Sequence, residues 1–107
     1  MKKMTKLTIY TTEESRYHNT SLVHAITEES RKNKLAGCTV YKGSLGYGQH
    51  RHMHDINILA LSENLPVIID IIDTREKIDT ILPFIQDNLK NGIYTLTQVE
   101  AFIPENK

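Results

Sequence analysis

The sequence predicts an α+β fold, in which two helices pack on one face of an antiparallel sheet of four strands. Four segments show the alternation or the β-branched composition of strands, and two segments carry apolar residues at helical spacing. They follow one another as strand, helix, strand, strand, helix, strand. Two right-handed crossovers in this order give the βαββαβ arrangement of a ferredoxin-like sandwich.

The first half of the chain supplies the first three elements. Apolar and polar residues alternate over 5–11, which predicts a strand, and the polar stretch 12–19 predicts a loop. Residues 20–34 carry apolar residues at helical spacing, which predicts a helix. Lysines lie at its C-terminal end, where the helix dipole favours cations, and Gly37 lies just beyond. Residues 38–43 are rich in strand formers and predict a second strand.

The second half supplies the other three. Residues 67–72 predict a strand that is apolar on both faces. A helix follows, for which Asp73 and Glu76 match a capping-box pattern, and Pro83 within its apolar stripe predicts a kink. Residues 96–103 predict the last strand. Because the helices cover only one face of the sheet, a second copy of the chain is the simplest cover for the other.

Composition narrows the functional classes. The 107 residues suit one domain over 1–107, and 39% hydrophobic with 24% charged residues is typical of a folded chain. The 13 basic residues equal the 13 acidic ones, which disfavours binding driven by bulk charge to nucleic acid or a membrane surface. A single cysteine, Cys38, suits a reducing compartment, and no apolar run is long enough for membrane insertion. We therefore expect a cytoplasmic protein.

The segment 44–56 is the first candidate for function. It contains two glycines, three histidines and an arginine, which predicts a long mobile loop or hairpin tip. Glycines allow the backbone to approach a ligand closely and its N–H groups to converge on an anion. Residues 56–61 fit either the returning arm of this hairpin or a helical turn.

Three histidines in this segment, His50, His52 and His54, alternate along the chain. On an extended backbone they would share one face and could hold Zn²⁺ or Cu²⁺. The other interpretation is three solvated loop histidines. We expect no enzyme, since Cys38 and the histidines have no matched acid–base partner in the sequence.

Three runs of residues resemble the PII-like signalling proteins, a superfamily that also contains the CutA proteins. These runs are Gly-Cys-Thr-Val-Tyr at 37–41, Gly-Tyr-Gly-Gln at 46–49 and Leu-Pro-Val-Ile-Ile-Asp-Ile-Ile at 65–72. PII proteins carry a similar Gly-x-Thr-Val strand, a glycine turn into a long loop called the T-loop, and a Leu-Pro-x-Val strand returning from it. The chain as a whole looks most like an uncharacterised PII-like domain family.

The resemblance implies an assembly and a ligand. It implies a homotrimer with the sheets facing inward, and an adenine nucleotide (ADP, AMP or ATP) in the clefts between subunits. The loop 44–56 would then report the bound ligand to a membrane transporter or an enzyme. No cofactor is required, and no nucleic-acid partner is implied.

Matched position by position, the resemblance implies nucleotide-binding residues in two places. One is the turn into the loop, and the other is the phosphate-gripping loop after the second helix. They are Gly46, Tyr47, Gly48 and Gln49, with Lys90 and Gly92. Since the second place holds one glycine and one lysine, ADP, AMP or a cyclic nucleotide is expected as readily as ATP. The sequence thus predicts a nucleotide sensor, with a CutA-like protein that binds divalent metal through its loop histidines as the alternative.

Overall fold

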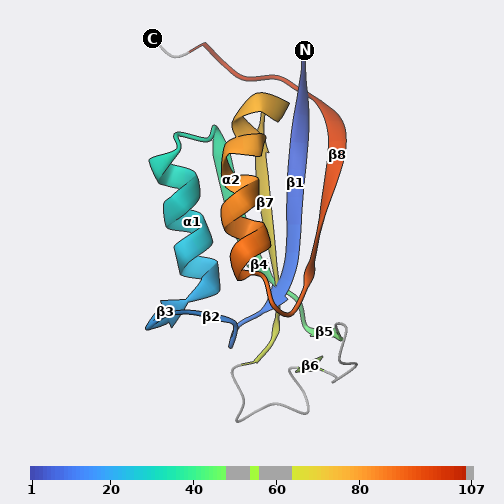
Figure 1. Ribbon diagram of the computed structural model, residues 1–107. Helices are drawn as coiled ribbons and strands as arrows, with labels where there is room; N and C mark the ends of the chain where they lie inside the picture. The colour runs from blue at the N-terminus through green and yellow to red at the C-terminus, as the bar shows by residue number, and fades with distance from the viewer. Residues whose placement is uncertain (48–53, 56–63, 106–107) are drawn as a thin grey trace.

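The structure, a computed structural model, describes residues 1–47, 54–55 and 64–105 (Figure 1). Helices and strands follow the predicted order, with short strands added between them. They are β1 (Lys2–Thr12), β2 (Arg16–Tyr17), β3 (Thr20–Ser21), α1 (Leu22–Lys32), β4 (Gly37–Lys42), β5 (Leu45–Gly46), β6 (His54–Asp55), β7 (Pro66–Asp73), α2 (Arg75–Asn88) and β8 (Ile93–Ala101).

Four long strands form one sheet in the order β4-β7-β1-β8, with every neighbouring pair antiparallel. Both helices lie on the same face of this sheet, and α2 lies in front of its central strands (Figure 1). This arrangement confirms the predicted ferredoxin-like βαββαβ sandwich. The other face of the sheet carries no element of the described chain.

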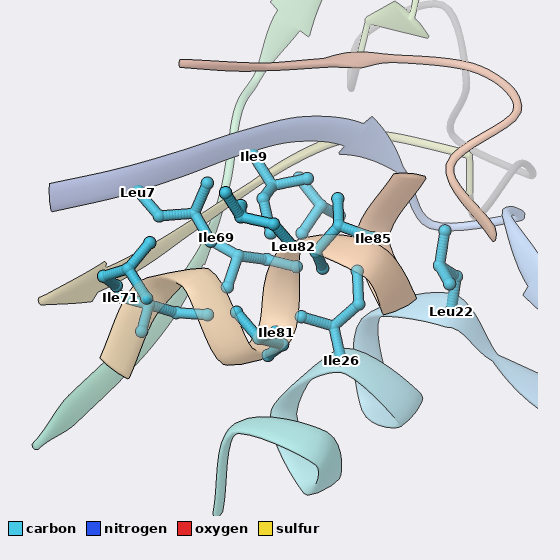
Figure 2. Packing of buried hydrophobic residues seen from close by; sticks show 11 residues of the cluster. Leu7, Ile9, Leu22, Ile26, Ile69, Ile71, Ile81, Leu82 and Ile85 are labelled. Carbon is cyan, nitrogen blue, oxygen red and sulfur yellow. The ribbon is translucent and has the colours of Figure 1, made fainter. Parts of the chain in front are cut away.

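The core lies between the sheet and the helices. Alternate residues of β7 are buried there, because successive side chains of a strand point to opposite faces. Figure 2 shows side chains from the two central strands pointing toward those of α2. The labelled members are Leu7, Ile9, Ile69, Ile71, Ile81, Leu82 and Ile85, with Leu22 and Ile26 from α1. Burying each such side chain stabilises the fold by about 1.5–3 kcal/mol.

The stretch 12–19 differs from the predicted loop. Arg16–Tyr17 and Thr20–Ser21 pair as a short hairpin directly before α1. His18 adopts a positive φ of 53° between them. Two-residue strands carry too few alternating positions to be recognised in a sequence.

The last strand lies earlier than predicted. It begins at Ile93, which pairs with Tyr10, and it ends at Ala101, which pairs with Lys2. Phe102 and Ile103 were included in the predicted strand because they are apolar, yet they are exposed. The strand ends where its partner β1 begins, so the pairing and not the composition sets its boundary.

The predicted capping box of α2 is wrong by one residue. Asp73 still belongs to β7, and Thr74 is the N-cap, with its hydroxyl accepting a hydrogen bond from the backbone N–H of Lys77. Asp73 instead accepts from the N–H groups of Thr74, at 2.6 Å, and Ala36, at 2.8 Å. The helix continues through Pro83 to Asn88.

No helix within the described ranges is both long enough and apolar enough to cross a membrane.

Candidate functional site

A pocket of about 510 Å³ opens at the end of the sheet where β1 finishes and β7 starts. Four chain segments line it: the end of β1, the turn from β4 into β5, the start of β7 and the turn between α2 and β8. The ladder between β4 and β7 ends at Lys42, and the chain that follows stays close to the start of β7, since the N–H of Gly43 donates to the Pro66 carbonyl. Sheet ends of this kind are where loops from distant parts of a chain meet.

A row of apolar residues crosses the sheet at this end. Strand register places Tyr41 beside Ile68, Ile68 beside Tyr10, and Tyr10 beside Ile93. All four lie on the face away from the helices. The residues next to them along each strand point to the opposite face, which is the face that the helices cover. Three of them also line the pocket, namely Tyr10, Ile68 and Ile93. The row therefore gives the pocket an apolar wall.

The next row toward the centre of the sheet is polar. Asp70 accepts hydrogen bonds from the Thr8 hydroxyl, at 2.7 Å, and from the Tyr41 hydroxyl, at 2.9 Å. The hydrogen bond to Asp70 is the main cause that raises the pKa of Tyr41, with smaller contributions from burial and from the charge of Asp70. Both carboxylate oxygens of Asp70 thus accept hydrogen bonds from neighbouring strands of the sheet.

Glycines let the pocket walls approach one another. Gly92 has a φ of +151°, and a Cβ there would clash with the carbonyl oxygen of Tyr10. Across the pocket, Gly46 packs against the ring of Pro66, and the N–H of Gly43 donates to the Pro66 carbonyl at 2.8 Å. Only glycine permits the contact at position 92.

The Thr11 hydroxyl lies between two parts of the site. It donates to the carbonyl oxygen of Asn91 at 3.0 Å and lies 2.8 Å from the Ser15 hydroxyl. These contacts hold the end of β1 against the turn between α2 and β8. Because Asn91 precedes Gly92, these contacts also hold the wall that contains Gly92 against β1.

The structure brings together three of the residues that the sequence indicated. Gly46 and Tyr47 line the pocket from one side and Gly92 from another, although 45 positions separate Tyr47 from Gly92 in the chain. Lys90 lies in a neighbouring cavity of about 230 Å³ together with Arg16. The two cavities share Thr12 and Asn91.

The other predicted site residues fall mostly outside the described ranges. Gly48, Gln49, His50 and His52 lie there, as do most of the predicted loop 44–56 and the alternative arm 56–61. The backbone of His54 is described, and it pairs with Gly46. Among the side chains that the structure describes, no three His, Cys, Asp or Glu residues gather as a metal site.

Sequence reasoning did not assign Tyr10, Thr11, Ile93 or Asn91 to the site. Alternation in 5–11 does place Tyr10 on the face opposite Leu7 and Ile9, but nothing local indicates that the segment ends beside Gly92. Cys38 is half-buried, and burial raises the pKa of its thiol, with the hydroxyls of Thr27 and Ser30 opposing the rise. A thiol in this state is a poor nucleophile.

The chain matches one protein family along almost its whole length. Residues 4–101 match the DUF190 family, described as "Uncharacterized ACR, COG1993". The protein belongs to the DUF190 family. A UPF0166 protein of Methanocaldococcus jannaschii is 34% identical over 97 residues, which cover 90% of this chain and 89% of the relative. A UPF0166 protein of Aquifex aeolicus is 32% identical over 95 residues, covering 89% of this chain and 90% of that protein.

This DUF190 chain shares its fold with PII-like proteins of solved structure. CPII from Thiomonas intermedia K12, a nitrogen regulatory PII-like protein, has been solved bound to ADP, AMP and bicarbonate, and also bound to ADP and bicarbonate. The two structures superpose on this chain with TM-scores of 0.64 and 0.69. Each covers 92% of this chain and 87% of CPII, at 15% identity. The shared fold confirms the resemblance to an uncharacterised PII-like family.

Proposed function

We propose that this DUF190 protein is a cytoplasmic, non-enzymatic regulatory protein of the PII-like type, which binds a small adenine nucleotide. The observation that carries the proposal is the pocket at the end of the sheet. It gathers Gly46, Tyr47 and Gly92 from the two places where the PII resemblance implies nucleotide contacts. The solved complexes of CPII with ADP and AMP support the same class of ligand for this fold.

The pocket suits a planar base and its sugar. Its volume of about 510 Å³ falls in the usual range for small-molecule sites. Tyr10 and Tyr47 line it, and these residues are 45% and 63% exposed, so their aromatic side chains are available for stacking. The glycines that line the pocket allow a ligand to approach the backbone closely.

The charges around the pocket favour a nucleotide that carries few phosphate groups. No lysine or arginine lines it in the part of the chain that the structure describes, while Lys90 and Arg16 line the adjoining cavity. Each additional phosphate adds negative charge that requires a cation or converging N–H donors. We therefore expect AMP and ADP to bind at least as tightly as ATP.

The uncovered sheet face supports assembly as a homotrimer with nucleotide clefts between subunits. The row Tyr41, Ile68, Tyr10 and Ile93 runs along this face into the pocket, so a second copy seated on the sheet would also border the ligand. In this proposal the segment 44–56 carries the signal to a membrane transporter or an enzyme. That requires the nucleotide to bind two arrangements of the segment with unequal affinity.

Calorimetry with AMP, ADP, ATP and cyclic AMP tests the proposal. We expect the wild-type protein to bind AMP or ADP, and Tyr47→Ala to weaken that binding roughly tenfold through loss of stacking. Phe102→Ala is the matched control, because Phe102 is an exposed aromatic residue that follows the end of β8, where Ala101 pairs with Lys2 at the end of the sheet away from the pocket. If the wild type binds none of these nucleotides but binds Zn²⁺, and loses Zn²⁺ when His50, His52 and His54 become alanine, the metal alternative replaces this proposal.

A further inference from the structure

Glu13 joins two segments that are far apart in the sequence but meet behind the pocket. It follows β1 directly, and its backbone N–H donates to the carbonyl oxygen of Leu65 at 3.0 Å. In return, the N–H of Leu65 donates to the Glu13 carboxylate oxygen Oε1 at 3.0 Å. The second carboxylate oxygen, Oε2, lies 2.7 Å from the Nζ of Lys42. One side chain therefore holds the chain both where it leaves β4 and where it enters β7.

The surroundings of this carboxylate strengthen these contacts. The Glu13 side chain is only 19% exposed, whereas that of Lys42 is 61% exposed. Burial by itself would raise the pKa of Glu13, but the hydrogen bonds from Lys42 and Leu65 outweigh it and lower the pKa. Charge-assisted hydrogen bonds of a shielded carboxylate are stronger than those of an open surface ion pair.

The residues that Glu13 holds are adjacent to the pocket wall. Lys42 precedes Gly43, and Leu65 precedes Pro66, and the N–H of Gly43 donates to the Pro66 carbonyl at 2.8 Å. Gly43 and Pro66 both line the pocket, whereas Glu13 does not. A shift of either held residue would therefore move a wall of the pocket although Glu13 touches no ligand there.

We propose that Glu13 is a positioning residue for the nucleotide pocket, because its carboxylate clamps Lys42 and Leu65 and so fixes the wall that Gly43 and Pro66 form. This inference rests on the proposed nucleotide function and deepens it. The neighbouring residue Glu14 supplies a natural comparison. Its backbone N–H donates to Oδ1 of Asn64 at 3.3 Å, whereas its exposed carboxylate is not among the groups that hold Lys42 and Leu65 in the described part of the chain.

The first test needs no ligand. Hydrogen exchange of the Leu65 and Gly43 amides is measured in the wild type, in Glu13→Ala and in Glu14→Ala. We expect exchange at both amides to accelerate roughly tenfold in Glu13→Ala and to stay unchanged in Glu14→Ala, while the amide of Ile69 in the core strand β7 stays protected in all three. Unchanged exchange at Leu65 and Gly43 in Glu13→Ala would overturn the clamp, whatever the ligand.

The second test measures the dissociation constant of ADP. We expect Glu13→Ala to bind ADP roughly tenfold more weakly than wild type, and Glu14→Ala to bind it equally well. Glu13→Gln should fall between them, since its amide oxygen still accepts from Leu65 but carries no charge for Lys42. Faster exchange with undiminished ADP affinity would overturn the positioning role. If the wild type binds no adenine nucleotide, the proposed function fails, and the exchange test alone decides the clamp.

Discussion

Gly92 shows how much a single position contributes to this site. Its φ of +151° belongs to a region that side chains avoid, and its Cα lies against the carbonyl group of Tyr10. The turn between α2 and β8 can therefore pass directly beside the last outward-facing aromatic residue of β1. Any larger residue would push this turn away and widen the gap between two walls of the pocket.

We predict that Gly92→Ala destabilises the fold by about 2 kcal/mol or more, because the backbone conformation is strained and the new Cβ meets the Tyr10 carbonyl. Urea denaturation followed by circular dichroism measures this change. Gly37→Ala is the matched control, since a Cβ at Gly37 meets nothing within 4 Å and its φ is ordinary. Equal stability of the two variants would show that the turn relaxes at no cost.

The start of α2 shows how an element is joined to its neighbours. Thr74 caps the helix, and the buried carboxylate of Asp73 accepts hydrogen bonds from the Thr74 N–H and the Ala36 N–H. Ala36 lies between α1 and β4. A single carboxylate thus holds two connections at the end of the sheet opposite the pocket.

We predict that Asp73→Ala lowers the free energy of unfolding by about 2–4 kcal/mol, because two backbone donors lose a charged acceptor in a buried place. Equilibrium unfolding in guanidinium chloride is the measurement. Asp79→Ala serves as control, since its ion pair with Arg75 is exposed and its loss should cost about 1 kcal/mol at most. A loss at Asp73 no larger than that at Asp79 would contradict this account.

At the scale of the whole molecule, the uncovered sheet face is the outstanding feature. Its rows differ in character: an apolar row by the pocket, a polar row around Asp70, and a mixed third row in which Ile72 lies between Lys6 and Gly37. A face with apolar side chains on it is better covered than solvated. The proposed trimer provides that cover.

Ile72→Arg tests the assembly without touching the pocket. The substitution places a second positive charge beside Lys6. Burying that charge between subunits without a partner costs on the order of several kcal/mol, which is enough to separate the subunits. We expect light scattering to show trimers for the wild type and monomers for the variant. Thr80→Arg, on the exposed side of α2, should remain trimeric. A wild type that is monomeric at micromolar concentration would contradict the assembly.

The sequence alone determined the order of the four long strands and two helices and, for the first strand and the second helix, the face that is buried. Alternation in 5–11 and the apolar stripe of the second helix indicate which side chains leave water, because a strand repeats every two residues and a helix every 3.6. The βαββαβ order then leaves few topologies. The resemblance through 37–41 and 65–72 also depends on short local runs of residues, so it is recognisable without a structure.

The tertiary structure alone decided where the pocket lies and what holds it. Tyr10, Gly46 and Gly92 meet only because strand register aligns the end of β1 with the starts of β7 and β8. Strand pairing also sets two boundaries that local sequence patterns predicted wrongly, namely the end of β7 at Asp73 and the bounds of the last strand. The clamp at Glu13 depends on a hydrogen-bonding partner 52 residues away. Contacts of that separation leave no periodic signal in the chain, since they arise from how the elements pack and not from which residues adjoin.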